Sequence, residues 1–216
     1  MKFTIIYDNK LYKRGIGLKP DWGFSCVIET GDKTILFDTG AKGDILLGNM
    51  KRLDITPMNI DKIVISHEHW DHSGGLNALA PLTNDIELYR LAKKIPRENL
   101  HLISAEKPQK ITEKVYTTGR LKGSVDEQSL VLKGEKCCYV LVGCSHPGVE
   151  KILGAARCHG NVLGLVGGFH GFDNFSILEE LDFICPCHCT QHKQELKSLY
   201  PTKYSEGGVG KVTEFF

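Results

Sequence analysis

The chain lacks long apolar runs and an excess of charge of either sign. No apolar stretch approaches the roughly 18 residues that a membrane-spanning helix needs. The 27 lysines and arginines are balanced by 26 aspartates and glutamates, which leaves a net charge of +1. Proteins that bind nucleic acid or an anionic membrane through surface charge carry a basic excess. The composition therefore predicts neither a nucleic-acid partner nor a membrane partner.

The sequence also lacks the features of a secretory signal. The N-terminal segment MKFTIIYDNK has only a short apolar stretch before charge returns, and it has no small-residue cleavage site. We therefore expect a cytoplasmic protein. Its 216 residues are enough to bury a substantial core, and no internal repeat, low-complexity run or linker interrupts them. This predicts a single domain over residues 1–216.

Eight cysteines are present, but a chain of this length without a signal is not a disulfide-stapled miniprotein. We expect them to be reduced, with several packed on buried strands as small apolar residues. The alternative is a structural zinc site built on CPCHC, although its C-x-C spacing is tighter than the usual ligand spacing. The cysteines are Cys26, Cys137, Cys138, Cys144, Cys158, Cys185, Cys187 and Cys189.

Short apolar runs alternate with segments of helical spacing. Strands are expected at residues 3–7, 24–29, 34–40, 60–66, 129–134, 137–146, 161–170 and 181–188, the fifth and sixth forming a hairpin. Helices are expected at residues 42–53, 74–82, 148–157 and 190–200, the last capped by its threonine. Trp22 and Phe24 are expected in the core. This mixture of strands and helices predicts an α/β or α+β layered fold.

Five of the expected strands end in residues that can bind metal. The residues are Asp38, the pair His67 and His69, His146, His170 and His188. In a sheet with parallel strands the carboxyl ends lie along one edge, where ligands bind. One such histidine would be unremarkable in a core, but five strand ends of this kind predict a shared site.

The segment SHEHWDHSGG, residues 66–75, has the densest group of these residues. In an extended segment residues i and i+2 point the same way, so His67 and His69 can hold one metal ion together. Asp71 and His72 follow where the chain starts to turn, so they can face a second ion. Gly74–Gly75 allow the backbone to bend sharply into the next helix.

At this point the sequence resembles a known family. HEHWDH matches the H-x-H-x-D-H signature of the metallo-β-lactamase fold hydrolases, and LFDTG, GCSHPG and PCHCT are similar to its first, third and last motifs. WGFSCVIE, DEQSLVL and GGFH further resemble the subgroup known as 7,8-dihydropterin-6-methyl-4-(β-D-ribofuranosyl)-aminobenzene-5'-phosphate synthase. The resemblance implies an α/β fold, a four-layer αβ/βα sandwich of two mixed β-sheets with outer helices and a metal site along one edge.

The resemblance also implies a set of metal ligands. The first metal would be held by His67, His69 and His146, and the second by Asp71, His72 and His188. Asp38 would orient a ligand histidine from behind. Imidazole and carboxylate ligands suit zinc, iron and manganese, and the resemblance implies one to two zinc ions.

His170 marks a departure from the family pattern, which places a bridging aspartate at the end of that strand. Three interpretations are open. His170 binds one metal only, it contacts the substrate, or Asp173 reaches back to replace the missing carboxylate. We favour the first two, because the strand run ends at His170 and Asp173 lies beyond a further glycine.

These residues predict a metal-dependent hydrolase. A bound metal lowers the pKa of its water to about 7 and so provides hydroxide near neutral pH. Asp71 and His170 are the candidate catalytic side chains. The expected substrate is a small molecule with an ester, phosphoester or related bond, and an anionic one, because a site without the bridging carboxylate is more positive. The alternative is a non-enzymatic metal-dependent sensor or small-molecule binding module of the same fold.

Overall fold

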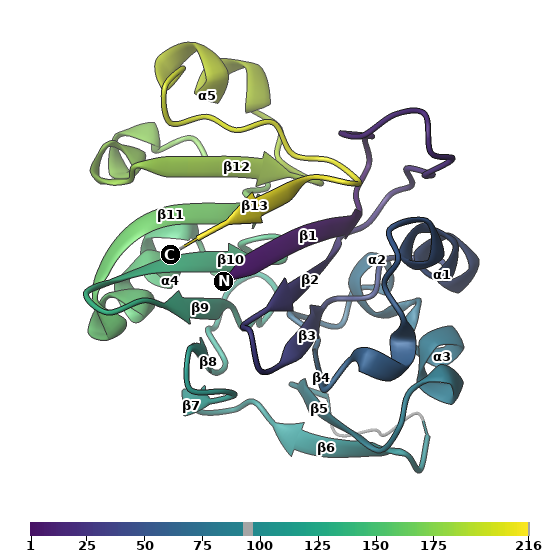
Figure 1. The fold of residues 1–216 in the computed structure, drawn as a ribbon. Helices are drawn as coiled ribbons and strands as arrows, with labels where there is room; N and C mark the ends of the chain where they lie inside the picture. Colours follow the sequence, from purple (N-terminus) through teal and green to yellow (C-terminus); the bar gives the residue numbers. More distant parts are fainter. Residues whose placement is uncertain (93–96, 216) are drawn as a thin grey trace. The chain divides into compact units, whose positions relative to one another are not determined.

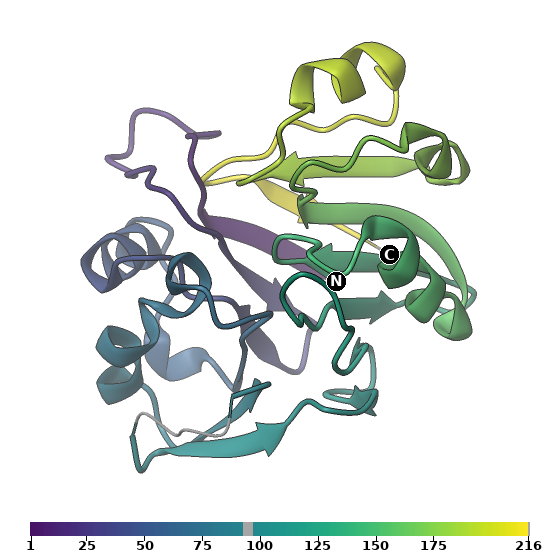
Figure 2. The same ribbon diagram turned by 180° about the vertical axis from the view of Figure 1, so that it is seen from behind.

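The computed structural model describes residues 1–92 and 97–215, which form two compact units. The first unit comprises Met1–Ala105 with Gly207–Phe216, and the second comprises Glu106–Glu206. Each unit is built around one mixed β-sheet and has an apolar core of its own (Figures 1 and 2). The expectation of a single domain over residues 1–216 therefore stays a prediction.

The sheet of the first unit has seven strands in the order β13-β1-β2-β3-β4-β5-β6. The strands are β1 (Lys2–Tyr7), β2 (Ser25–Glu29), β3 (Thr34–Phe37), β4 (Lys62–Val64), β5 (Ile86–Arg90), β6 (Leu100–Ser104) and β13 (Val212–Glu214). Pairing is antiparallel from β13 to β3 and parallel from β3 to β6. Because β3 and β4 run parallel, Asp38 and His67 follow their strands at the same edge of this sheet.

Among the described residues of the first unit, five short helices accompany this sheet. They are α1 (Gly43–Arg52), η1 (Pro57–Asn59), α2 (Trp70–Ser73), α3 (Leu76–Leu79) and η2 (Ala80–Leu82). Of these, α1, α3 and η2 bury apolar side chains. In α1, Leu46 and Met50 lie four positions apart and are both buried in the core of this unit. Burying a side chain of this size stabilises the fold by about 1.5–3 kcal/mol. The helix expected over residues 74–82 is split, because Pro81 at the start of η2 has no N–H to continue the α-helical bonding.

The sheet of the second unit has six strands in the order β12-β11-β10-β9-β8-β7. The strands are β7 (Gln109–Lys110), β8 (Val115–Thr117), β9 (Leu130–Lys133), β10 (Cys137–Val142), β11 (Asn161–Gly168) and β12 (Phe183–Cys187). Pairing is antiparallel from β7 to β10 and parallel from β10 to β12. The three parallel strands are the ones followed by His146, His170 and His188.

Two α-helices and two short 3-10 helices accompany the second sheet. They are α4 (Val149–Ala156), η3 (Arg157–His159), η4 (Phe175–Glu180) and α5 (Lys193–Leu199). Ile152 of α4 and Leu196 of α5 are buried in the core of this unit. The expected cap of the last helix is wrong. α5 follows His192 as its N-cap, while the Thr190 hydroxyl donates to the carbonyl of Cys187 at 2.7 Å and accepts from Phe169 N–H at 2.9 Å.

The predicted α/β fold with two mixed sheets is confirmed, and so is the β9–β10 hairpin. Cys26, Cys138, Cys185 and Cys187 are buried on strands, as expected for small apolar residues, and the expectation that all eight cysteines are reduced stays a prediction. Phe24 is buried as expected, whereas Trp22 is 50% exposed and the prediction that it packs in the core is wrong.

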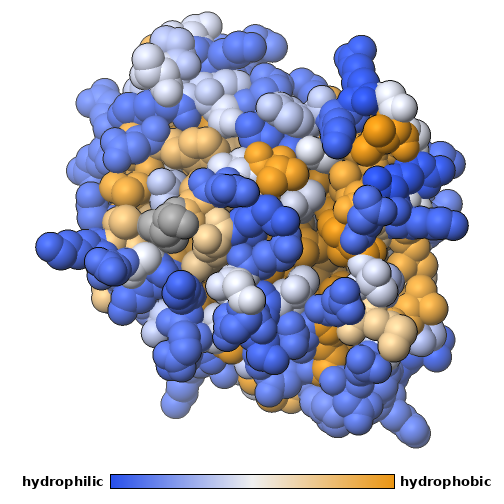
Figure 3. Space-filling view, in the orientation of Figure 1, coloured by the Kyte–Doolittle hydropathy of each residue, from blue (hydrophilic) through white to orange (hydrophobic). Residues whose placement is uncertain are grey.

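The surface mixes polar and apolar side chains. On the face shown in Figure 3, apolar areas are exposed between hydrophilic ones, which is ordinary for folded proteins. Over residues 1–92 and 97–215, no helix combines the length and the apolar character that crossing a membrane requires.

Candidate metal centre

The first unit gathers the side chains of HEHWDH at the end of β4. His67 is buried in the bend shortly after the strand. His69 is exposed and precedes α2, and that short helix carries Asp71 and His72. Nε2 of His67 lies 3.1 Å from Nδ1 of His69. The rings of His67 and His72 have their centroids 4.2 Å apart. Local folding thus brings these side chains together, as their spacing predicts.

The geometry of this cluster fits a metal ion. Two imidazole nitrogens bound to one tetrahedral zinc at 2.0–2.1 Å are about 3.3 Å apart. The His67 and His69 nitrogens, at 3.1 Å, are close to that separation. Imidazole and carboxylate donors also suit zinc, iron or manganese. The donor set of the first unit is therefore compatible with the metal that its sequence predicts.

Asp38 is the buried carboxylate that organises this cluster. Its Oδ1 accepts from the backbone N–H of Ser66 at 2.7 Å, and its Oδ2 accepts from the Ser66 hydroxyl at 2.8 Å and from Nδ1 of His72 at 2.7 Å. The Ser66 hydroxyl lies 2.9 Å from Nδ1 of His67. With the Nδ1 atoms of both rings engaged, Nε2 is the ligand atom of each. The orienting role expected for Asp38 is supported, and Ser66 extends it to a second histidine.

Asp71 is held by a residue that the sequence did not single out for this purpose. Its Oδ2 accepts a hydrogen bond from the indole N–H of Trp22 at 2.8 Å, and its backbone carbonyl accepts from Phe24 N–H at 3.2 Å. This explains the position of Trp22, because an indole N–H needs a polar partner that an apolar core does not offer. Trp22 therefore fixes the orientation of the candidate catalytic carboxylate.

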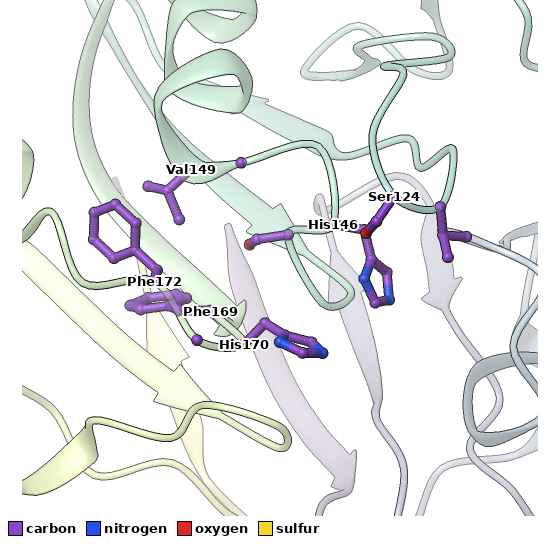
Figure 4. A pocket seen from close by; sticks show the side chains of 10 residues that line it. Ser124, His146, Val149, Phe169, His170 and Phe172 are labelled. Atoms are coloured by element: carbon purple, nitrogen blue, oxygen red, sulfur yellow. The ribbon is translucent and has the colours of Figure 1, made fainter.

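In the second unit, His146, His170 and His188 follow three adjacent parallel strands. The rings of His146 and His170 have their centroids 5.2 Å apart (Figure 4). His188 is 3% exposed, whereas His170 is exposed. Beside these histidines, the thiol of Cys189 donates to Sγ of Cys144 at 3.3 Å. The loops after β10 and β12 thus lie against each other, and the structure brings the three strand ends to one edge of this sheet.

Glu127 organises the loop that carries His146. This carboxylate is 0% exposed and stands between β8 and β9. Its Oε1 accepts backbone N–H groups from three consecutive residues of the loop, at 2.9, 3.1 and 3.2 Å, and its Oε2 accepts from His146 N–H at 3.0 Å. The three residues are Gly143, Cys144 and Ser145. The sequence predicted no role for Glu127, whose only local signal is an acidic side chain shortly before the buried strand β9.

The protein's relationship to known families follows from a match over parts of both units. Residues 20–142 match the metallo-beta-lactamase superfamily, and they make up more than half of the chain. The chain belongs to this superfamily. Superfamily members bind metal ions and are mostly hydrolases, which supports a metal-dependent hydrolase in general terms.

Two relatives from Methanocaldococcus jannaschii match nearly the whole chain. An uncharacterized protein is 28% identical over 264 aligned residues, covering 96% of this chain and 98% of its own. The 7,8-dihydropterin-6-methyl-4-(beta-D-ribofuranosyl)-aminobenzene-5'-phosphate synthase is 26% identical, covering 91% of this chain and 92% of its own. The resemblance to the synthase subgroup that the motifs indicate is confirmed at this level of similarity.

A solved structure shares the fold over the full length. The crystal structure of a metal-dependent hydrolase of the beta-lactamase superfamily aligns with a TM-score of 0.76 at 22% identity, covering 100% of this chain and 99% of that one. The metallo-beta-lactamase fold predicted from the motifs is confirmed.

This superfamily member also stores backbone strain at its candidate site. Of the described residues other than glycine, five have a positive φ, and four of them follow β3, β10, β11 or β12. These four are Asp38 at 58°, Ser145 at 61°, His170 at 50° and His188 at 43°, and the fifth is Asp54 at 56°. A non-glycine residue in this region is uncommon, and such strain concentrates at functional sites. The strand ends named by the sequence are therefore where the backbone is most constrained.

The predicted ligands fall into two groups. His67, His69, Asp71 and His72 belong to the first unit, and His146, His170 and His188 belong to the second. Their assignment to a first and a second metal ion stays a prediction. Asp173, the alternative to His170, is exposed and lies beyond Gly171 in the loop after β11.

Proposed function

We propose that this protein is a metal-dependent hydrolase that cleaves an ester, phosphoester or related bond in a small anionic molecule. The observation that supports this most strongly is the cluster of His67, His69 and His72 behind which Asp38 is buried. Asp38 aligns two of these imidazoles, that of His72 directly and that of His67 through Ser66. Burying this carboxylate costs free energy, because taking a charge out of water is unfavourable. Orienting metal ligands is the role in which such a carboxylate recurs.

The proposal assigns the metal ligands as follows. His67, His69, Asp71, His72, His146 and His188 would hold about one to two ions, zinc first and iron or manganese as alternatives. His170 would bind one of the ions or the substrate. When bound, the metal would polarise the scissile bond and make hydroxide available near neutral pH.

The protein's own groups would prepare the reaction in two ways. The Asp71 carboxylate, fixed by the Trp22 indole, would hold and orient the attacking water through a hydrogen bond to one of its oxygens. The exposed imidazole of His170 would donate a hydrogen bond to negative charge that develops on the substrate. The Asp71 carboxylate is held by the Trp22 indole before substrate binds, so little reorganisation of this group is needed during the reaction.

The charge of the site supports an anionic substrate. The family pattern has a bridging aspartate where this chain has His170, so one negative charge is absent from the candidate site. An anionic group such as a phosphate ester would then be bound more favourably than a neutral ester.

Hydrolysis assays on chromogenic esters, phosphomonoesters and phosphodiesters would test this proposal. We expect turnover that a chelator abolishes and that added zinc, iron or manganese restores, with anionic substrates preferred. Asp71→Ala should lower the rate by roughly three orders of magnitude or more with the fold intact. Asp85→Ala, at an exposed position in the same unit, should leave it unchanged. Wild-type rates in Asp71→Ala with unchanged metal content would contradict the assigned role, and metal-dependent ligand binding without turnover on any substrate would favour the sensor.

A further inference from the structure

A cavity of about 400 Å³ lies in the second unit beside His146 and His170 (Figure 4). Two serines, Ser124 and Ser145, contribute hydroxyl groups to its wall. Among the described residues that line it, none is a lysine, arginine, aspartate or glutamate. The cavity therefore offers a ligand imidazoles, hydroxyls and apolar side chains, without a permanently charged group.

The two ends of the cavity differ in character. One end has the imidazole rings of His146 and His170, while Phe172 and Val149 form the other, with Phe169 between them (Figure 4). Phe169 is 1% exposed and Val149 is 1% exposed, so these two form a fixed apolar wall. Phe172 is half-buried and its ring is braced edge-on by the ring of Phe175, with centroids 6.1 Å apart.

We propose that this cavity binds a planar aromatic ring of the substrate, with the substrate's anionic group beside His146 and His170. A cavity of about 150 Å³ is enough to hold benzene, so the volume here leaves room for a ring and an attached phosphoryl group. Aromatic rings in stacked or edge-to-face contact gain stabilisation beyond that from buried area alone. Aryl phosphoesters are thus the class of substrate that this site fits. The hydrolysis of such a substrate rests on the proposed function, whereas its binding in the cavity does not.

A phosphate group by itself is a poor occupant of the apolar end. It would lose its hydration against Phe172 and Val149 without gaining a cation, and burying a charge in that way is costly. The imidazoles at the other end can donate hydrogen bonds to it. The two ends therefore orient the ligand, with the ring toward Phe172 and the anion toward the histidines.

Binding of three phosphonates to the metal-loaded protein, measured by titration calorimetry, would test the proposal. Phenylphosphonate, cyclohexylphosphonate and methylphosphonate share the anion and differ in the group that would enter the cavity. We expect phenylphosphonate to bind about tenfold more tightly than methylphosphonate and several-fold more tightly than cyclohexylphosphonate. Phe172→Ala should reduce both preferences to within about twofold, and Phe172→Leu should abolish the preference for phenyl over cyclohexyl while keeping part of the preference over methyl.

Tyr12→Ala is the matched control, because it removes a half-exposed aromatic ring from the first unit and should leave all three affinities unchanged. Equal affinity of wild-type protein for the three phosphonates would overturn the proposal, as would an aryl preference that persists in both Phe172 variants. The outcome is separate from that of the proposed function. An aryl preference in a protein that hydrolyses none of the substrates would support aryl binding in the cavity and contradict the proposed hydrolase activity. Hydrolysis without an aryl preference would support the activity and contradict aryl binding.

Discussion

Two buried carboxylates, Asp38 and Glu127, set the positions of histidines in the two units. Asp38 acts on His67 and His72 through side-chain contacts, two of them made by way of Ser66. Glu127 acts on His146 through the backbone, by accepting four N–H groups of its loop. Neither residue needs to touch a metal or a substrate to matter. Burying a carboxylate is costly unless hydrogen bonds replace its hydration. The donors around Asp38 and Glu127 form such bonds, and bonds to a charged acceptor are strong, so the groups that donate them are held firmly in place.

Replacing Glu127 by glutamine should expose this role. The amide keeps the shape of the side chain, but its NH₂ group cannot accept from the backbone N–H groups that it would face. We expect Glu127→Gln to lower the free energy of unfolding by roughly 2–5 kcal/mol, measured by denaturant titration, because buried donors lose a charged acceptor. Glu135→Gln, at an exposed position of the β9–β10 turn, should change it by less than about 0.5 kcal/mol. Equal stability of the two variants would show that the loop does not depend on this carboxylate.

His170 combines an exposed side chain with a φ of 50°. His170→Ala removes the imidazole but keeps the strained backbone, so we expect turnover or metal affinity to fall by about 10- to 100-fold or more with little change in melting temperature. His170→Gly should be at least as stable as His170→Ala, since glycine adopts a positive φ without steric cost. Melting curves and steady-state rates on the same preparations would check this. A large loss of stability with unaltered kinetics would instead assign His170 to packing.

At the scale of elements, the candidate site residues lie in the segments that follow the parallel strands of the two sheets. Each parallel strand that was recognised in the sequence delivers a polar residue to the edge of its sheet, and α2 then turns the chain so that Asp71 and His72 join His67. These signals are local, so the sequence alone was enough to find them. Strands β5, β6, β7, β8 and β13 were missed, because strand formation depends on pairing and packing against neighbours that can lie far away in the sequence.

Asp61 ties β3 to β4, the strands that lead to Asp38 and His67. Its carboxylate accepts from Thr34 N–H at 2.8 Å and from the Lys33 ammonium at 2.9 Å. Burial alone would raise the pKa of Asp61, but these two partners outweigh it and lower the pKa below its ordinary value. A folded-state pKa below the unfolded one means that the stabilisation is present above about pH 4 and is lost as the pH falls through the folded-state pKa.

We therefore expect Asp61→Asn to destabilise the protein by about 1 kcal/mol at pH 7, because the partly exposed contacts are screened by water. The difference between wild type and variant should shrink as the pH falls below about 4. Urea unfolding at pH 7 and at pH 3 would measure it, with the exposed Asp85→Asn as reference. A difference that is the same at both pH values would refute the assigned charge effect.

At the scale of the whole molecule, the sequence was enough to predict the fold and the family, but not the contacts that position the site residues. The α/β fold and the membership of the metallo-beta-lactamase superfamily were predictable, because a motif such as HEHWDH is contiguous and its resemblance to the family is specific. Trp22 and Glu127 were not, since each acts through a hydrogen bond to a residue far along the chain. Their roles depend on tertiary contacts, and a short segment of sequence carries no information about these.

The central claim is that HEHWDH in the first unit binds a metal ion. Elemental analysis of the purified wild-type protein and of His67→Gln tests it most directly, with His101→Gln at an exposed position of β6 as the matched control. We predict about one to two zinc, iron or manganese ions per chain in the wild type and in His101→Gln, and the loss of at least one ion in His67→Gln. Metal content that is unchanged in His67→Gln, or a wild-type protein that is free of metal and still hydrolyses its substrates, would contradict the account.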